Sequence, residues 1–179
     1  MDTKTLIVTI LSSSFLAATV TSLASGLFSL KLKKNDFLYD FHKNILDKRI
    51  MAYETVESII ASLRGSIVDQ DGLSYHQVFS FGNEEFINHL ILIQSAMKQG
   101  MWLSSDITKH INQINYIYLN ADEDLIEFGK DNYESIANER NNLENVFARD
   151  ISKLHEIEPF LLSKSNESNE YNFVNVKSV

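Results

Sequence analysis

The chain has 179 residues, with 16 basic and 24 acidic side chains, a formal net charge of −8, no cysteine and one proline. This length fits one ordinary domain. The absence of cysteine excludes disulfide-stapled and zinc–thiolate proteins, and a hydrophobic content of 44% excludes a wholly disordered chain. The acidic balance argues against nucleic acid as a partner, because phosphate contacts need clustered Lys and Arg. A mostly helical protein remains.

Residues 5–30 contain no charged side chain, a run of 26 positions that ends at Lys31. As an α-helix this run is about 39 Å long, which exceeds the ~30 Å hydrocarbon core of a membrane. Its Ser and Thr hydroxyls can bond to carbonyls one turn earlier, which lowers their cost in lipid. We therefore predict a transmembrane anchor with a basic collar over residues 1–34.

A cleaved signal peptide is the competing interpretation, because residues 22–24 read Ser-Leu-Ala, a small-x-small pattern. A buried helix of a soluble protein is the third. The apolar run continues past residue 24, and Lys31, Lys33 and Lys34 follow it at once. Such a cluster resists translocation and stays in the cytoplasm by the positive-inside rule. The prediction is a single-pass protein of the cell inner membrane, with these lysines at the lipid headgroups and the C-terminal domain in the cytoplasm.

Small residues recur at every fourth position of the run, at Ser14, Ala18, Ser22 and Gly26. In lipid, small side chains allow two helix backbones to approach closely. Small residues that merely fill a weakly hydrophobic span are the alternative. The stripe predicts a face through which the span associates with itself or with a partner span.

The remainder of the chain reads as amphipathic helices. Removing the four lysines and one aspartate of residues 1–34 leaves 12 basic and 23 acidic side chains. Apolar residues recur at helical spacing in four segments, interrupted in the first by Arg49, whose charged end we expect in water. The fold class predicted is all-α, with the transmembrane helix followed by an antiparallel bundle of about four helices over residues 35–162. The expected helices are residues 36–63, one capped by Asn83 and ending at Gly100, one starting at Ser104 or Ser105, and residues 131–158.

Four features are expected to interrupt these helices. Residues 65–82 are rich in turn formers and predict a loop, in which residues 75–81 form a short strand or a lid. Gly129 separates the last two helices, and Pro159 marks the end of the final one. Residues 163–179 are polar and predict a disordered tail.

Few residues suggest chemistry. Glu85 and His89 are four apart, as are Asp106 and His110, so two carboxylate–histidine pairs on adjacent helices are a candidate metal site. The Glu-x-x-His motif of ferritin-like proteins is absent, and surface pairs are the preferred interpretation. A calcium-loop reading of residues 120–131 fails, because the sixth position is Leu125 instead of glycine.

No phosphate-binding glycine loop and no nucleophile motif occur in the sequence. Tyr75, Phe79, Phe81 and Trp102 complete a core more readily than they form a ligand pocket. We predict no catalytic residue, no cofactor and no metal, and therefore not an enzyme.

Residues 42–61 follow the run and include the stretch Ile-Leu-Asp-Lys-Arg-Ile-Met-Ala-Tyr-Glu at 45–54. This resembles small bacterial single-span inner-membrane proteins of unknown function, in which such a stretch opens a helical cytoplasmic region. The resemblance implies a bacterial membrane protein and brings no catalytic residues.

The function predicted is that of a membrane-anchored helical interaction or scaffold protein, which binds a protein partner or itself. The alternative is a small membrane effector, similar to a toxin, a holin or a phage-defence protein, that acts through an oligomerised span. An enzyme of unrecognised type is the third class.

Overall fold

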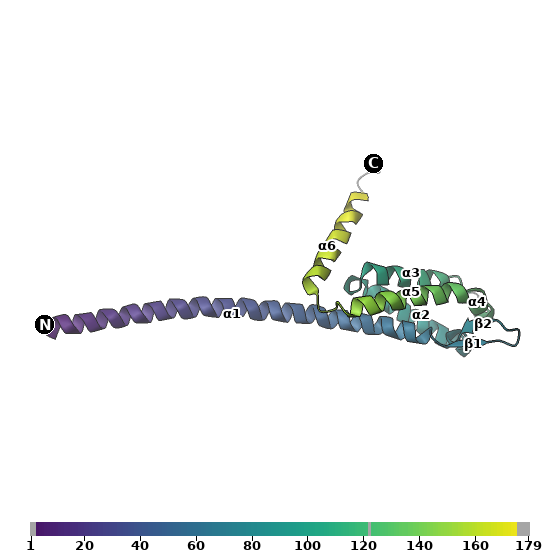
Figure 1. Cartoon of the computed structure of the whole chain (residues 1–179), viewed down its shortest axis with the longest axis horizontal. Helices are drawn as coiled ribbons and strands as arrows, with labels where there is room; N and C mark the ends of the chain where they lie inside the picture. The colour runs from purple at the N-terminus through teal and green to yellow at the C-terminus, as the bar shows by residue number, and fades with distance from the viewer. Residues whose placement is uncertain (1–2, 122, 175–179) are drawn as a thin grey trace. The chain divides into compact units, whose positions relative to one another are not determined.

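A computed structural model describes the backbone of residues 3–121 and 123–174, and the side chains of residues 21–22, 25–121 and 123–167. The described residues form six α-helices, two short strands and two 3-10 turns (Figure 1). They divide into two units, Met1–Asn44 and Ile45–Val179. The predicted all-α class is confirmed at this level.

The first unit consists of a single helix. α1 spans Thr3–Ser62, so the uncharged run of residues 5–30 is helical throughout and the helix continues into the second unit. The sequence favours one continuous helix, because residues 3–62 contain no proline and a single glycine, Gly26. No helix among the residues with described side chains is long and apolar enough to cross a membrane. The predicted span falls largely outside those residues, because side chains 5–20 are not among them.

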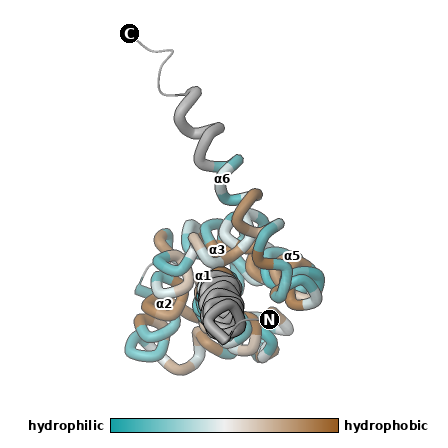
Figure 2. The backbone as a smooth tube through the Cα atoms, turned by 90° about the vertical axis from the view of Figure 1, so that its left-hand side faces the viewer, coloured by the Kyte–Doolittle hydropathy of each residue, from teal (hydrophilic) through white to brown (hydrophobic). Residues whose placement is uncertain are grey.

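The second unit is a helical bundle. The C-terminal part of α1 shares one apolar core with α2 (Asn83–Lys98), α3 (Ser105–Tyr118) and α5 (Tyr133–Ile151). The short α4 (Leu125–Asp131) lies beside β2 and η1. Along α2, α3 and α5 the tube alternates between hydrophilic and hydrophobic residues, as expected for helices with one buried face (Figure 2).

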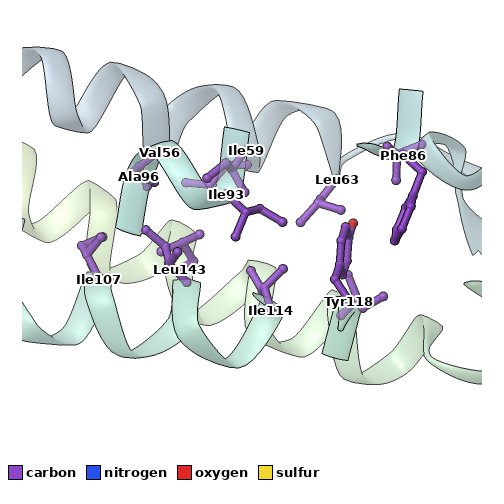
Figure 3. Packing of buried hydrophobic residues seen from close by; sticks show 14 of the residues in the cluster. Val56, Ile59, Leu63, Phe86, Ile93, Ala96, Ile107, Ile114, Tyr118 and Leu143 are labelled. Carbon is purple, nitrogen blue, oxygen red and sulfur yellow. The ribbon is translucent and has the colours of Figure 1, made fainter. Parts of the chain in front are cut away.

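One apolar core joins these helices (Figure 3). Each fully buried Leu, Ile or Phe side chain contributes about 1.5–3 kcal/mol relative to exposure. The core residues lie at helical spacing, about one side chain per turn on the inner face of each helix. The core includes Val56, Ile59 and Leu63 from α1 and the residue after it, Ile93 and Ala96 from α2, Ile107 and Ile114 from α3, and Leu143 from α5.

A two-stranded hairpin occupies most of the predicted loop. β1 (Ser66–Val68) and β2 (Ser74–His76) pair antiparallel, and the 3-10 turn η1 (Gln77–Phe81) follows directly. Gly72 has φ = +77°, a left-handed conformation that favours glycine, and its N–H donates to the Asp69 carbonyl at 3.0 Å. The expected strand at 75–81 thus ends at His76, and the remainder of that segment is helical.

The starts of α2 and α3 differ in how they are capped. Ser104 occupies the N-cap of α3 and its Oγ accepts a hydrogen bond from the Ile107 N–H at 3.3 Å, which confirms the predicted start. α2 begins at Asn83, but its N-cap residue is Gly82, with φ = +85° and no side-chain cap. Asn83 is therefore not the cap that the sequence suggested. The N-cap position has a positive φ, which glycine adopts more readily than asparagine does.

Gly129 lies inside α4 and does not separate two helices as predicted. A Cβ atom at this position would lie 2.8 Å from the Phe79 ring. The glycine therefore serves close packing between α4 and η1, and the chain breaks instead at Asn132, which joins α4 to α5.

Pro159 marks the beginning of a helix, where the sequence analysis expected an end. α5 stops at Ile151 and α6 spans Ile157–Val174, so Pro159 lies in the first turn of α6. Proline is tolerated there because the first N–H groups of a helix have no intrahelical partner. α6 also continues through residues 163–174, for which the sequence predicted a disordered tail. Lys164 pairs with Glu167 at 2.9 Å within this segment, and Glu167 accepts a hydrogen bond from the Ser105 hydroxyl.

Candidate functional site

The predicted membrane-facing residues lie along α1. The lysines of the predicted collar, Lys31, Lys33 and Lys34, are exposed, and large apolar neighbours are exposed with them, including Phe28 at 70% and Leu32 at 59%.

The predicted association face is described only in its second half. Ser22 and Gly26 are exposed, and a Cβ atom built on Gly26 would meet no atom of the described residues within 4 Å. The side chains of Ser14 and Ala18 lie outside the described residues. Gly26 is therefore not required for packing within the described part of the chain.

Arg49 is buried, contrary to the prediction that its charged end lies in water. Only 4% of the residue is exposed, Nη1 donates to the Leu154 carbonyl at 2.7 Å, and the guanidinium lies 4.1 Å from the centre of the Phe160 ring. Leu154 follows the C-terminal end of α5, where unpaired carbonyls favour a positive charge. The carbonyl and the ring compensate part of the charge, while Nε is buried without a hydrogen-bond partner. Arg49 thus attaches α1 to the segment that joins α5 to α6.

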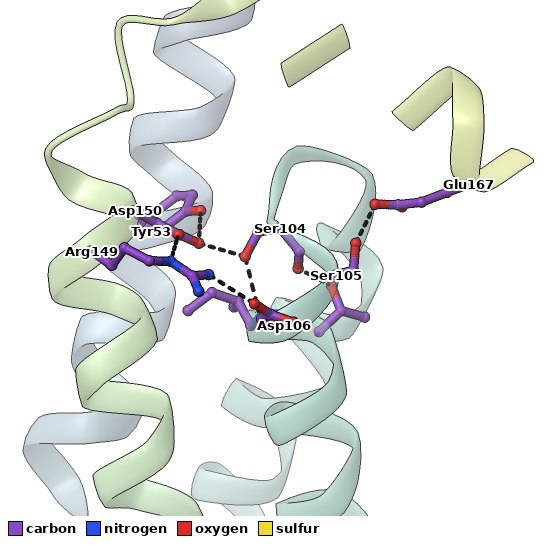
Figure 4. Close-up of polar contacts among 9 residues, drawn as sticks. Tyr53, Ser104, Ser105, Asp106, Arg149, Asp150 and Glu167 are labelled. Atoms are coloured by element: carbon purple, nitrogen blue, oxygen red, sulfur yellow. Dashed lines mark hydrogen bonds and ion pairs between the residues drawn. The ribbon is translucent and has the colours of Figure 1, made fainter. Parts of the chain in front are cut away.

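One turn after Arg49, a polar network, here called the corner network, joins α1, α3 and α5 (Figure 4). Its centre is the buried carboxylate of Asp150. One oxygen accepts hydrogen bonds from the Tyr53 hydroxyl at 3.1 Å and the Ser104 hydroxyl at 2.5 Å, and the other accepts from Arg149 Nε at 3.0 Å. Arg149 also pairs with Asp106 at 2.9 Å. Arg49 and Tyr53, which belong to the stretch that carries the resemblance noted in the sequence, thus lie at this corner.

The hydrogen bonds of the corner network link helices to one another. Burial, and then the charge of Asp150, raise the pKa of the Tyr53 hydroxyl, so Tyr53 stays protonated and donates at neutral pH. Both oxygens of Asp150 are occupied by groups from three helices. The arrangement holds α1 against α3 and α5, and its donors and acceptors satisfy one another.

The two candidate carboxylate–histidine pairs do not form. His110 Nδ1 lies 2.7 Å from Glu139 on α5, and Asp106 pairs with Arg149. His89 lies 2.6 Å from Ser62 on α1. Among the described residues, no group of three or more His, Asp or Glu side chains is arranged to hold a metal ion. In the segment once compared with a calcium loop, Asp124 caps α4 by accepting from the Glu127 N–H at 3.1 Å.

The four aromatic residues singled out in the sequence separate into three environments. Tyr75 and Phe79 are core residues, and the Phe79 ring packs edge-on against Phe128 at 5.6 Å. Trp102 packs beside a second small cluster, with Lys48 Nζ 4.8 Å from its ring centre. Phe81 is 59% exposed at the rim of a pocket.

Sequence reasoning missed the Ser62–His89 contact, which joins residues 27 positions apart. Ser62 ends α1, and His89 is 6% exposed on α2. Burial lowers the pKa of His89 to about 4, with a smaller effect from His76, so the ring is neutral at pH 7. The one signal available was a histidine among the apolar positions of α2, which indicates burial and says nothing about its partner.

Comparison of the chain with protein-family models, with curated proteins and with solved structures finds no match.

Proposed function

We propose that this chain is a membrane-anchored, non-catalytic interaction protein of a bacterial inner membrane. In this proposal residues 1–34 hold the chain in the membrane and the helical bundle binds a protein partner at the cytoplasmic face. The observation that carries it is the 26-residue uncharged run, which lies within uninterrupted helix and is followed by three exposed lysines. A helix of this length spans a bilayer, and a lysine cluster at its end remains in the cytoplasm.

The surface of the bundle supports the binding half of the proposal. Ile87 and Ile91 lie one turn apart on α2 and are 52% and 61% exposed. Two adjacent exposed isoleucines form an apolar spot on an otherwise polar helix face, which a partner would cover.

Extraction of membranes with alkaline carbonate tests the anchor. The wild-type chain should stay in the pellet. Leu16→Arg, which puts a charge in the middle of the run at a cost of about 3 kcal/mol on insertion, should release much of it. Asn35→Arg adds the same charge outside the run and serves as the control. Recovery of the wild-type chain in the soluble fraction would contradict the anchor.

Reporter fusions at the C-terminus test the orientation. A fluorescent protein should be active there and alkaline phosphatase inactive. Changing Lys31, Lys33 and Lys34 together to Gln should raise the phosphatase signal, because these charges hold the C-terminal side in the cytoplasm. High phosphatase activity of the wild-type fusion would instead support the signal-peptide or inverted reading.

A photo-crosslinking residue tests partner binding. Placed at Ile91 it should give one discrete adduct in cells, while the same residue at the exposed Glu57 on α1 should give none. Equal labelling from both positions would argue against a binding face on α2.

A further inference from the structure

One pocket of the bundle lies where the end of α1, the η1 turn and the first half of α2 meet, and it has a volume of about 460 Å³. This is within the range of small-molecule sites. Val78, Phe81 and Leu92 contribute apolar surface to it. Its polar lining includes Ser62, Gln77, Glu85, Asn88 and His89.

The hydrogen bonds of Ser62 determine the protonation of His89. The Ser62 hydroxyl donates to the Ile59 carbonyl at 2.7 Å, and its oxygen lies 2.6 Å from His89 Nε2. When the Ser62 O–H donates to the Ile59 carbonyl, the Nε2–H donates to the Ser62 oxygen, and the other ring nitrogen, Nδ1, is then an acceptor. Nδ1 is buried and has no hydrogen-bond partner. A buried ring nitrogen without a hydrogen-bond partner is unusual in proteins.

The charge of the lining selects the kind of ligand. The pocket residues include one carboxylate, that of Glu85, and no Lys or Arg. The His89 ring is neutral, because its burial lowers its pKa to about 4. An anionic ligand would find no cation here, whereas a ligand that brings N–H donors and a positive charge would find Glu85 and the amide oxygens of Gln77 and Asn88.

We propose that this pocket binds a small aromatic amine in its protonated form. The ammonium group pairs with the Glu85 carboxylate, and the ring packs on the exposed face of Phe81 and on Val78. The Ser62–His89 pair forms the polar end of the site. The site does not depend on membrane anchorage, so the two proposals can fail separately.

The test is calorimetric titration of the full-length chain in detergent with tyramine at pH 7. The matched probe is 3-(4-hydroxyphenyl)propanoate, which replaces the ammonium by a carboxylate. Tyramine should bind saturably and the propanoate should not. Glu85→Gln should weaken tyramine about tenfold, because it removes a charge-assisted hydrogen bond. Glu84→Gln, an equal change of charge at an exposed neighbour outside the pocket, should leave the affinity within about twofold.

Phe81→Ala provides a second variant that leaves the fold intact, because the side chain is exposed. It should weaken tyramine several-fold, whereas Leu73→Ala, an exposed apolar residue that does not line the pocket, should not. Equal effects of Glu85→Gln and Glu84→Gln would reduce the binding to general surface charge and overturn the proposal. Equal binding of the propanoate, or no heat from tyramine, would overturn it as well.

Discussion

The guanidinium of Arg49 lies 4.1 Å from the centre of the Phe160 ring, which brings the C-terminal third of α1 and the first turn of α6 together. The same side chain donates to the Leu154 carbonyl. Ile157 and Phe160 pack with Ile45 in a second small core beside it. Arg49 and this small core together attach the first turn of α6 to the bundle.

Replacing Arg49 by alanine should destabilise the bundle by about 2–3 kcal/mol, since it removes the ring contact, the hydrogen bond and the packing of the stem. Lys48→Ala is the matched control, because Lys48 is exposed and contacts only the face of Trp102 among the described interactions. It should change stability by less than about 0.5 kcal/mol. Chemical denaturation of both full-length variants measures the difference, and equal losses would contradict a specific role for Arg49.

Gly129→Ala should cost about 1–3 kcal/mol, because the added methyl group would lie 2.8 Å from the Phe79 ring in a packed core. At Gly100 the nearest atoms to an added methyl are 3.6 Å away on the Thr108 side chain. Gly100→Ala should therefore leave the melting temperature nearly unchanged. An unaltered melting temperature for Gly129→Ala would show that Phe79 moves aside without penalty.

Acidification should weaken the bundle through His89. Its pKa is about 4 in the folded chain and 6.5 in the ordinary state, so the unfolded chain binds more protons between these values. The stabilisation is present above about pH 6.5 and is lost as the pH falls toward about 4, by about 3 kcal/mol in total. The pKa of His76 is lowered as well, first by burial, and acts in the same direction.

The measurement is the free energy of unfolding at several pH values for the wild type and for His89→Gln. The variant should show a shallower loss between pH 6.5 and 4, and His155→Gln, at an exposed position, should follow the wild type. Parallel curves for wild type and His89→Gln would exclude His89 as a source of acid sensitivity.

The predicted span association gives a fourth test. Gly26→Ile and Ala18→Ile should weaken self-association or pairing in a membrane two-hybrid assay, because bulk separates two closely packed helices. Leu16→Ile and Leu23→Ile change the run without touching the small-residue face and should have little effect. Since no described residue lies within 4 Å of a Cβ atom built on Gly26, a loss at this residue would not arise from misfolding of the described bundle. Equal sensitivity at both sets of positions would remove the interface.

Local patterns predicted much of the helical content. Ser104 was recognisable as a cap, and the spacing of Ile107, Ile111 and Ile114 indicated one buried face. Pro159 and Gly129 were misread because each has two meanings: proline ends a helix or fits its first turn, and glycine breaks a helix or allows a close contact. Only the neighbouring segment, such as the Phe79 ring against Gly129, decides between them.

The partners of the buried polar side chains could not be predicted from the sequence, for a different reason. Arg49 resembles a surface arginine until the Leu154 carbonyl and the Phe160 ring are brought to it from more than 100 positions away. Ser62 and His89 likewise meet only when α1 and α2 pack. Such partners depend on tertiary contacts, which a single sequence does not specify.

The corner network has a consequence for the order in which the chain assembles. Tyr53 and Asp150 are 97 positions apart, and Ser104 and Asp150 are 46 apart. Closing loops of this length is entropically costly, so these bonds should form after the helices have docked. In stopped-flow experiments Tyr53→Phe should accelerate unfolding while the refolding rate stays unchanged, whereas slower refolding would place the contact in the nucleus. The hydrogen bonds around Asp150 would then slow unfolding, and so determine the lifetime of the folded bundle.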